Sequence, residues 1–149
     1  MKQYKETAIT KELKRLATKC RGLLTPECVV HAAALPQSPL HNAFTWDDSE
    51  AAEQYRLWQA RQLIRTTVQY VNIQGQPRAM RVFVSLTPDR ECDAGGYRQT
   101  LRVLTHSEQR RQMLQDALAE MECFQAKYTL LTELAEVFAA MRKARSSLK

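Results

Sequence analysis

The chain has 149 residues, 44% of them apolar and 26% charged, with a net charge of +6. We expect one domain over residues 1–149, with helices and a β-hairpin over 1–105 and a helical segment over 106–149. The apolar runs are too short to span a bilayer and the N-terminus lacks the apolar core of a secretory signal, which argues against a membrane or secreted protein and predicts a cytoplasmic one.

The first predicted element is an amphipathic helix over residues 7–21. Apolar side chains recur there every three or four residues, as one face of a helix requires. The opposite face carries four basic side chains: Lys11, Lys14, Arg15 and Lys19. Residues 1–21 carry a net charge of +5, so this segment suits a polyanionic partner.

Two further helices are predicted over residues 26–35 and 47–65. Thr25 and Pro26 are a typical N-cap and first helical residue, and the almost wholly apolar helix that follows should be buried. Asp47 and Glu50 resemble a capping box for the next helix. That helix is expected to be covered on much of its circumference, with Tyr55 on the covered side. It should expose one polar, basic and aromatic stripe: Gln54, Trp58, Arg61 and Arg65.

The periodicity then changes to that of a β-hairpin. Residues 66–73 are rich in β-branched and aromatic side chains, residues 74–77 form a turn, and residues 79–86 alternate. The alternation predicts one face made of Met80, Val82, Val84 and Leu86. Residues 87–96 are predicted to form a loop, and residues 97–103 either a third strand or an irregular turn.

The C-terminal third is predicted to be helical. Thr105 and Glu108 form a second capping-box pattern, and no glycine or proline follows. Apolar residues then recur at the spacing of a heptad seam: Leu114, Ala117, Met121, Phe124, Tyr128, Leu131, Ala135 and Phe138. The segment forms either one helix of about 38 residues or two helices broken near 127–129, where helix propensity dips. The expected fold class is therefore α+β and mostly helical, with winged-helix-like N-terminal helices, a hairpin and a long C-terminal helix or helical hairpin.

No motif for catalysis or metal binding stands out. The usual nucleophile, phosphate-loop, dinucleotide and zinc-protease signatures are absent from the sequence, so we expect no enzyme and no cofactor. The adjacent Asp47 and Asp48 are explained by helix capping. Four cysteines without a CxxC pair predict free thiols, two or three of them buried. A zinc site can be assembled from Cys20, Cys28, His31 and His41, but zinc ligands usually come in close pairs, so plain packing is the preferred interpretation and no metal is expected.

One stretch of the chain resembles a known family. The residues from Ser38 to Ile64 fit the pattern SPLH..F.WDD..AA..YR..QAR.LI, and the similarity extends over most of residues 22–140. This pattern is similar to that of an uncharacterised family of small proteins encoded by bacteriophages and prophages. Members are loosely described as helix-turn-helix DNA-binding proteins. The resemblance implies a phage protein in the cytoplasm of a bacterial host and brings no catalytic residues.

The leading functional hypothesis is a regulatory protein that binds double-stranded DNA. In it the exposed stripe of the 47–65 helix contacts bases or phosphates, and the basic face of the 7–21 helix holds the DNA backbone. The connection of about eleven residues between the second and third helices argues against it, because a helix-turn-helix joins these helices by a short turn.

The alternative hypothesis is a protein-interaction module that binds a host protein or self-associates. Its basis is the heptad seam, which would pair with a second copy through Leu114, Met121, Phe124, Tyr128, Leu131 and Phe138. The same seam could instead pack on the hairpin and the 47–65 helix within one monomeric core. Trp58 could likewise lie under a neighbouring element as a core residue.

Overall fold

The computed structural model describes residues 6–46, 50–91 and 95–147. It is mostly helical, with a two-stranded antiparallel hairpin and a C-terminal pair of helices, and this confirms the predicted α+β class. Among the described residues of the N-terminal part, the chain forms three helices and one 3₁₀ turn: α1 (Ala8–Lys19), α2 (Pro26–Ala33), η1 (His41–Ala43) and α3 (Glu50–Thr66).

Local capping explains where α1 and α2 begin. The side chains of Thr7 and Thr25 accept hydrogen bonds from the backbone N–H groups of Thr10 and Cys28, at 3.1 and 3.3 Å. The predicted capping box of α3 pairs Asp47 with Glu50, and Asp47 lies outside the described residues.

The helix predicted over residues 26–35 ends early, and its wholly buried character is wrong. α2 stops at Ala33, and the Leu35 side chain is 55% exposed. Pro36 disfavours helical geometry in the residue before it. The ring nitrogen Nδ1 of His41 lies 2.8 Å from the carbonyl oxygen of Ala33 and provides a partner for a carbonyl at the helix end.

The β-region contains two small sheets instead of one long hairpin. Strands β1 (Val68–Ile73) and β2 (Gln76–Arg81) pair around a turn at Gln74–Gly75, where both residues have positive φ. A second sheet pairs β3 (Phe83–Val84) with β4 (Arg98–Gln99). The predicted continuous strand over 79–86 is therefore wrong.

Val82 is the residue at which the chain changes sheets. Its N–H donates to the Thr67 carbonyl at 3.0 Å, while its own carbonyl accepts from the Thr100 N–H at 2.8 Å. Phe83 is consequently buried, although strict alternation placed it on the opposite face from Val82.

Two short helices lie in the region predicted to form a loop followed by a strand or an irregular turn. α4 (Thr87–Arg90) forms at the start of the predicted loop, and α5 (Thr100–Thr105) follows β4 directly. The Thr105–Glu108 capping box is wrong, because Thr105 ends α5 and its hydroxyl donates to the Arg102 carbonyl at 2.8 Å.

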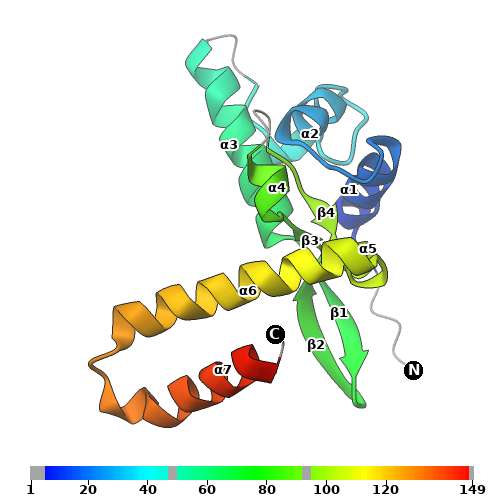
Figure 1. Cartoon of the computed structure of the whole chain (residues 1–149). Helices are drawn as coiled ribbons and strands as arrows, with labels where there is room; N and C mark the ends of the chain where they lie inside the picture. The colour runs from blue at the N-terminus through cyan, green and yellow to red at the C-terminus, as the bar shows by residue number, and fades with distance from the viewer. Residues whose placement is uncertain (1–5, 47–49, 92–94, 148–149) are drawn as a thin grey trace.

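The C-terminal segment forms two helices, which is one of the two predicted alternatives. α6 (Ser107–Tyr128) is followed by η2 (Thr132–Leu134) and α7 (Ala135–Ser147), which turns back along α6. Figure 1 shows this helical hairpin projecting from the body formed by the first three helices. Within α6, all of which the structure describes, no residue is buried, and α7 buries only Phe138. Burial of the whole heptad seam in one monomeric core is therefore wrong.

The hydrophobic core lies between α1, α2, α3 and β3. It consists of Leu13, Leu16, Ala17, Leu24, Val29, Ala33, Leu40, Phe44, Ala60, Ile64, Val82 and Phe83. Leu24, between α1 and α2, joins Tyr97 by two backbone hydrogen bonds of 2.7 and 2.8 Å, which extends the β3–β4 sheet toward the helices. No helix in the described ranges is both long and apolar enough to cross a membrane.

Candidate nucleic-acid interface

A cavity of about 610 Å³ lies where α3, β2, β3, α4 and α6 meet. Four arginines line it: Arg61, Arg65, Arg81 and Arg90. Glu120 is the single carboxylate among the described lining residues. We name this cavity the arginine cleft.

The ends of two elements position three of these arginines. Arg61 and Arg65 are four residues apart and so share one face in the last two turns of α3, while Ala60 and Ile64 are fully buried on another. Arg81 is the last residue of β2. Among the described residues, no carboxylate lies within 4 Å of the guanidinium of Arg61, Arg65 or Arg81. These three charges are therefore available to an anionic ligand.

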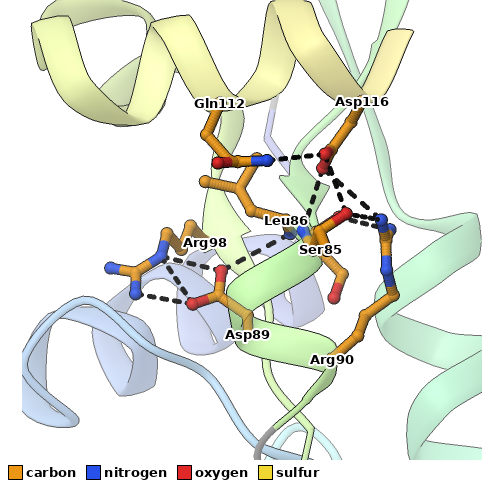
Figure 2. A network of polar contacts seen from close by, with 8 residues as sticks. Ser85, Leu86, Asp89, Arg90, Arg98, Gln112 and Asp116 are labelled. Carbon is orange, nitrogen blue, oxygen red and sulfur yellow. Dashed lines mark hydrogen bonds and ion pairs between the residues drawn. The ribbon is translucent and has the colours of Figure 1, made fainter. Parts of the chain in front are cut away.

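Arg90 is held in place by a network that joins α4 to α6 (Figure 2). Its guanidinium donates to the Ser85 carbonyl at 2.9 Å and to the Thr87 hydroxyl at 2.7 Å, and it lies 3.4 Å from Asp116. Arg90 therefore helps to build the wall of the cleft, and its charge is partly compensated.

Asp116 is the centre of this network. It accepts hydrogen bonds from the Thr87 N–H at 2.9 Å, the Thr87 hydroxyl at 2.8 Å and the Gln112 amide at 2.9 Å. Burial alone would raise the pKa of Asp116, but the hydrogen bonds from Gln112 and Thr87 outweigh it and lower the pKa below its ordinary value. The carboxylate thus fastens α6 to the start of α4.

A second ion pair fixes the other side of α4. Asp89 is 3% exposed and accepts three hydrogen bonds from the Arg98 guanidinium, from Nε at 2.8 Å to Oδ2 and 3.1 Å to Oδ1, and from Nη2 at 2.6 Å to Oδ1. Figure 2 shows this fork-like pair beside the Asp116 network. The Asp116 network therefore holds α4 against α6, and the Asp89 pair holds α4 against β4.

Gly96 brings the wall of the cleft close to Leu23. A Cβ atom at position 96 would lie 2.4 Å from Cδ1 and 2.6 Å from Cγ of Leu23. Close packing therefore accounts for this glycine, without any need for an anion at its backbone amide.

The predicted stripe on α3 divides into two parts. Arg61 and Arg65 line the cleft, whereas Gln54 and Trp58 are exposed and do not line it. The Trp58 side chain is 51% exposed and stacks on Tyr55 with ring centroids 5.6 Å apart. The interpretation of Trp58 as a core residue is therefore wrong. The Tyr55 side chain is 49% exposed, so its predicted place on the covered side of the helix is wrong as well.

The basic face of α1 does not join the cleft. Lys14 is held between Glu6 Oε1 and Gln69 Oε1, each 2.7 Å from its Nζ atom, and Arg15 pairs with Glu12. Hydrogen bonding to Arg15 lowers the pKa of Glu12. Lys11 and Lys19 are exposed, and none of the four basic residues lines the cleft. Half of the predicted basic face is thus neutralised by neighbours.

Of the four side chains considered for zinc, Cys20 and Cys28 lie close together, with their Sγ atoms 3.1 Å apart. The His41 ring contacts the Ala33 carbonyl and stacks on Trp46 with ring centroids 5.1 Å apart. Over the ranges that the structure describes, no group of three or more His, Cys, Asp or Glu side chains is arranged to hold a metal ion. Cys20 and Cys28 are half-buried, Cys123 is exposed, and Cys92 lies outside the described residues. The prediction that two or three of the four thiols are buried is therefore wrong.

Sequence reasoning missed Arg81, Arg90 and Glu120 as members of the site. In the sequence Arg81 is one polar residue of an alternating strand, and Arg90 is one charge in a polar loop. Their approach to α3 depends on the change of sheets at Val82, for which the sequence carries no clear signal. Comparison with protein-family models, with curated proteins and with solved structures found no match to this chain.

Proposed function

We propose that the protein is a non-enzymatic DNA-binding protein that holds the phosphate backbone of double-stranded DNA in the arginine cleft. The observation that carries this proposal is the convergence of Arg61, Arg65 and Arg81 on one cavity without a carboxylate partner among the described residues. Arginine presents a planar fork of donors that matches phosphate oxygens, and clustered arginines release counterions when they meet a polyanion.

The surroundings of the cleft suit phosphate contacts better than base reading. The arginines line a cavity where several elements meet, and its walls are held by the Asp116 and Asp89 networks. Phosphate contacts position a protein on DNA without specifying sequence. Trp58 and Tyr55 are exposed on the same helix as Arg61 and could add stacking or apolar contacts beyond the cleft. The biological setting that goes with this proposal is regulation of a phage cycle in a bacterial cytoplasm.

The test is binding of the full chain to a labelled random-sequence duplex, measured by fluorescence anisotropy over a salt series. Wild-type affinity should fall steeply as salt rises. The double variant Arg61→Ala with Arg65→Ala should bind at least about tenfold more weakly and show a shallower salt slope, by about 0.9 for each phosphate that is no longer neutralised. Both side chains are on a helix surface, so the fold should be retained.

The matched control is Arg142→Ala with Lys143→Ala on α7, which removes the same charge from two exposed residues that do not line the cleft. Its affinity should stay close to wild type. Equal reductions in affinity in both double variants would mean that net charge alone attracts DNA. Absence of salt-dependent binding in the wild type would reject the proposal.

A second candidate function is self-association through the C-terminal helical hairpin. It is favoured by a group of large apolar side chains on α6, α7 and their connection that are 39–90% exposed: Leu114, Met121, Phe124, Leu130, Leu131 and Val137. Such a group on one projecting element is typical of an interaction surface. Sedimentation velocity of the wild-type chain over a concentration range tests this candidate, which requires a species heavier than the monomer.

A further inference from the structure

Two thiols that are separated in the sequence meet between α1 and α2. Cys20 is the C-terminal cap of α1, and Cys28 is the third residue of α2. The chain reverses between them at Arg21 and Gly22, both of which have positive φ. The Sγ atoms lie 3.1 Å apart, with the Cys20 thiol donating to the sulfur of Cys28. A disulfide of about 2.05 Å would need the sulfurs to approach by roughly 1 Å.

The two thiols differ in acidity. A hydrogen bond from the Thr25 side chain is the main influence that lowers the pKa of Cys28 below that of an ordinary thiol, and the hydrogen bond from Cys20 adds to it. Burial, followed by the contact with Cys28, raises the pKa of Cys20 to about 11. Because the thiolate is the reactive form, this difference in acidity favours Cys28 over Cys20 as the first thiol to react.

The pair opens to solvent through a groove of about 710 Å³ between α1 and α2. Both cysteines are half-buried and line this groove, together with the cationic side chains of Arg15 and Lys19, the imidazole of His31 and the carboxylates of Glu12 and Glu27. A small molecule can therefore reach the sulfurs. The groove is separate from the arginine cleft, with which it shares no lining residue among those described.

We propose that Cys20 and Cys28 form a thiol–disulfide exchange site that reacts with a low-molecular-weight disulfide and closes into an intramolecular disulfide between α1 and α2. This site is independent of the proposed DNA binding. In the reducing compartment that the sequence predicts, the dithiol is the resting form and the disulfide a transient response to oxidant.

The reaction proceeds in two exchange steps. The Cys28 thiolate attacks one sulfur of the small disulfide; a mixed disulfide forms at Cys28, and the departing thiolate takes a proton from solvent. Cys20 then loses its proton, and its sulfur attacks the Sγ atom of Cys28. The Cys20–Cys28 bond forms and the second small thiolate leaves and is protonated. Two electrons pass from the two protein thiols to the small disulfide, which is reduced to two thiols.

The test is incubation of the full-length protein with oxidised glutathione, followed by peptide mapping by mass spectrometry. In the wild type the Cys20 and Cys28 peptides should be joined, with a loss of two hydrogen atoms and no retained glutathione. Cys20→Ser should accumulate the glutathione adduct at Cys28, because the resolving thiol is missing. Cys28→Ser should form an adduct at Cys20 at least about tenfold more slowly, because that thiol ionises less readily.

Three outcomes would overturn the proposal. One is a wild-type protein that keeps a glutathione adduct at Cys28 with Cys20 reduced. Another is a disulfide that joins either residue to Cys92 or Cys123 in preference to the pair. The last is an equal rate of adduct formation in the Cys20→Ser and Cys28→Ser proteins. The wild-type measurement needs no substitution, so the proposal stays testable even if one variant fails to fold.

Discussion

Asp116 shows how much of this fold depends on single polar residues. Its carboxylate is 12% exposed and connects α6 to Thr87, twenty-nine residues earlier in the chain. By contrast, the ion pair of Glu122 with Arg145 joins two side chains that are each about half exposed. Solvent-exposed pairs of this kind contribute little, whereas removing an acceptor from a mostly buried donor leaves that donor unsatisfied.

We therefore expect Asp116→Ala to lower the free energy of unfolding by about 1–3 kcal/mol. Glu122→Gln, the matched control on the same helix, should change it by less than about 0.5 kcal/mol. Urea denaturation at pH 7 measures both values. An Asp116→Ala protein as stable as wild type would mean that α4 and α6 are joined mainly by apolar contacts.

The same residue predicts a pH dependence. Burial acts to raise the pKa of Asp116, but hydrogen bonds from Gln112 and Thr87 prevail, so this pKa is lower in the folded protein than its ordinary value. Its stabilising contribution is thus fully present above the unfolded carboxylate pKa of about 4 and is lost as pH falls through the lower folded value. The wild type should lose more stability than Asp116→Ala between pH 7 and pH 3. The pKa of Glu12 is also lowered, but Glu12 is present in both proteins, so its contribution to the pH dependence of stability cancels in the comparison.

At the scale of elements, α1 and α3 carry similar charges in different surroundings. On the basic face of α1, Lys14 and Arg15 form ion pairs with neighbouring carboxylates, and the remaining lysines are away from the arginine cleft. The last turns of α3 carry Arg61 and Arg65 into the cleft. Helical periodicity depends only on the spacing of residues along the chain. It therefore predicted the basic side chains on both helices but could not predict which of them form ion pairs with carboxylates.

This contrast predicts unequal roles for the two helices in DNA binding. Lys11→Gln with Lys19→Gln removes the same charge as Arg61→Ala with Arg65→Ala, but from exposed positions on α1. We expect the lysine variant to keep its melting temperature and to bind less than about threefold more weakly at physiological salt, since distant charges are screened. The anisotropy assay compares the two variants directly. An equal or greater reduction in the lysine variant would place α1 in the contact surface.

At the scale of the whole molecule, the C-terminal hairpin stands apart from the core. Its heptad seam makes ring contacts within the hairpin, between Phe124 and both Tyr128 and Phe138, but leaves other apolar residues in solvent. Leu130 is 90% exposed and Leu131 is 47% exposed at the tip of the hairpin. A second copy of the chain that covers these apolar side chains would explain why they lie on the surface of the monomer.

We therefore expect Leu130→Glu with Leu131→Glu to shift the protein toward the monomer in sedimentation velocity. Charges at these positions disfavour an apolar interface and bury nothing in the monomer. Ala119→Glu with Ala126→Glu adds the same charge at exposed positions of α6 outside the seam, and should leave self-association unchanged. A wild-type chain that sediments as a monomer at every concentration would remove this candidate function.

Local signals in the sequence determined most of the secondary structure. Apolar periodicity located α1, Thr25 and Pro26 marked the start of α2, the change to a period of two marked the hairpin, and the dip in propensity near 127–129 marked the end of α6. These signals act over a few residues, within one or two turns of backbone hydrogen bonding, so a sequence displays them directly.

Only the tertiary structure decided which residues meet. The sequence identified Arg61 and Arg65 but not Arg81 and Arg90, which reach the same cleft because β2 ends where the chain changes sheets. The sequence offered Cys20 and Cys28 only as possible zinc ligands, and the turn at Arg21 brings their two sulfur atoms into direct contact. Such contacts depend on how the helices and strands pack and on hydrogen bonds between residues far apart in the sequence, such as Thr87 and Asp116. No local periodicity of the sequence encodes these contacts.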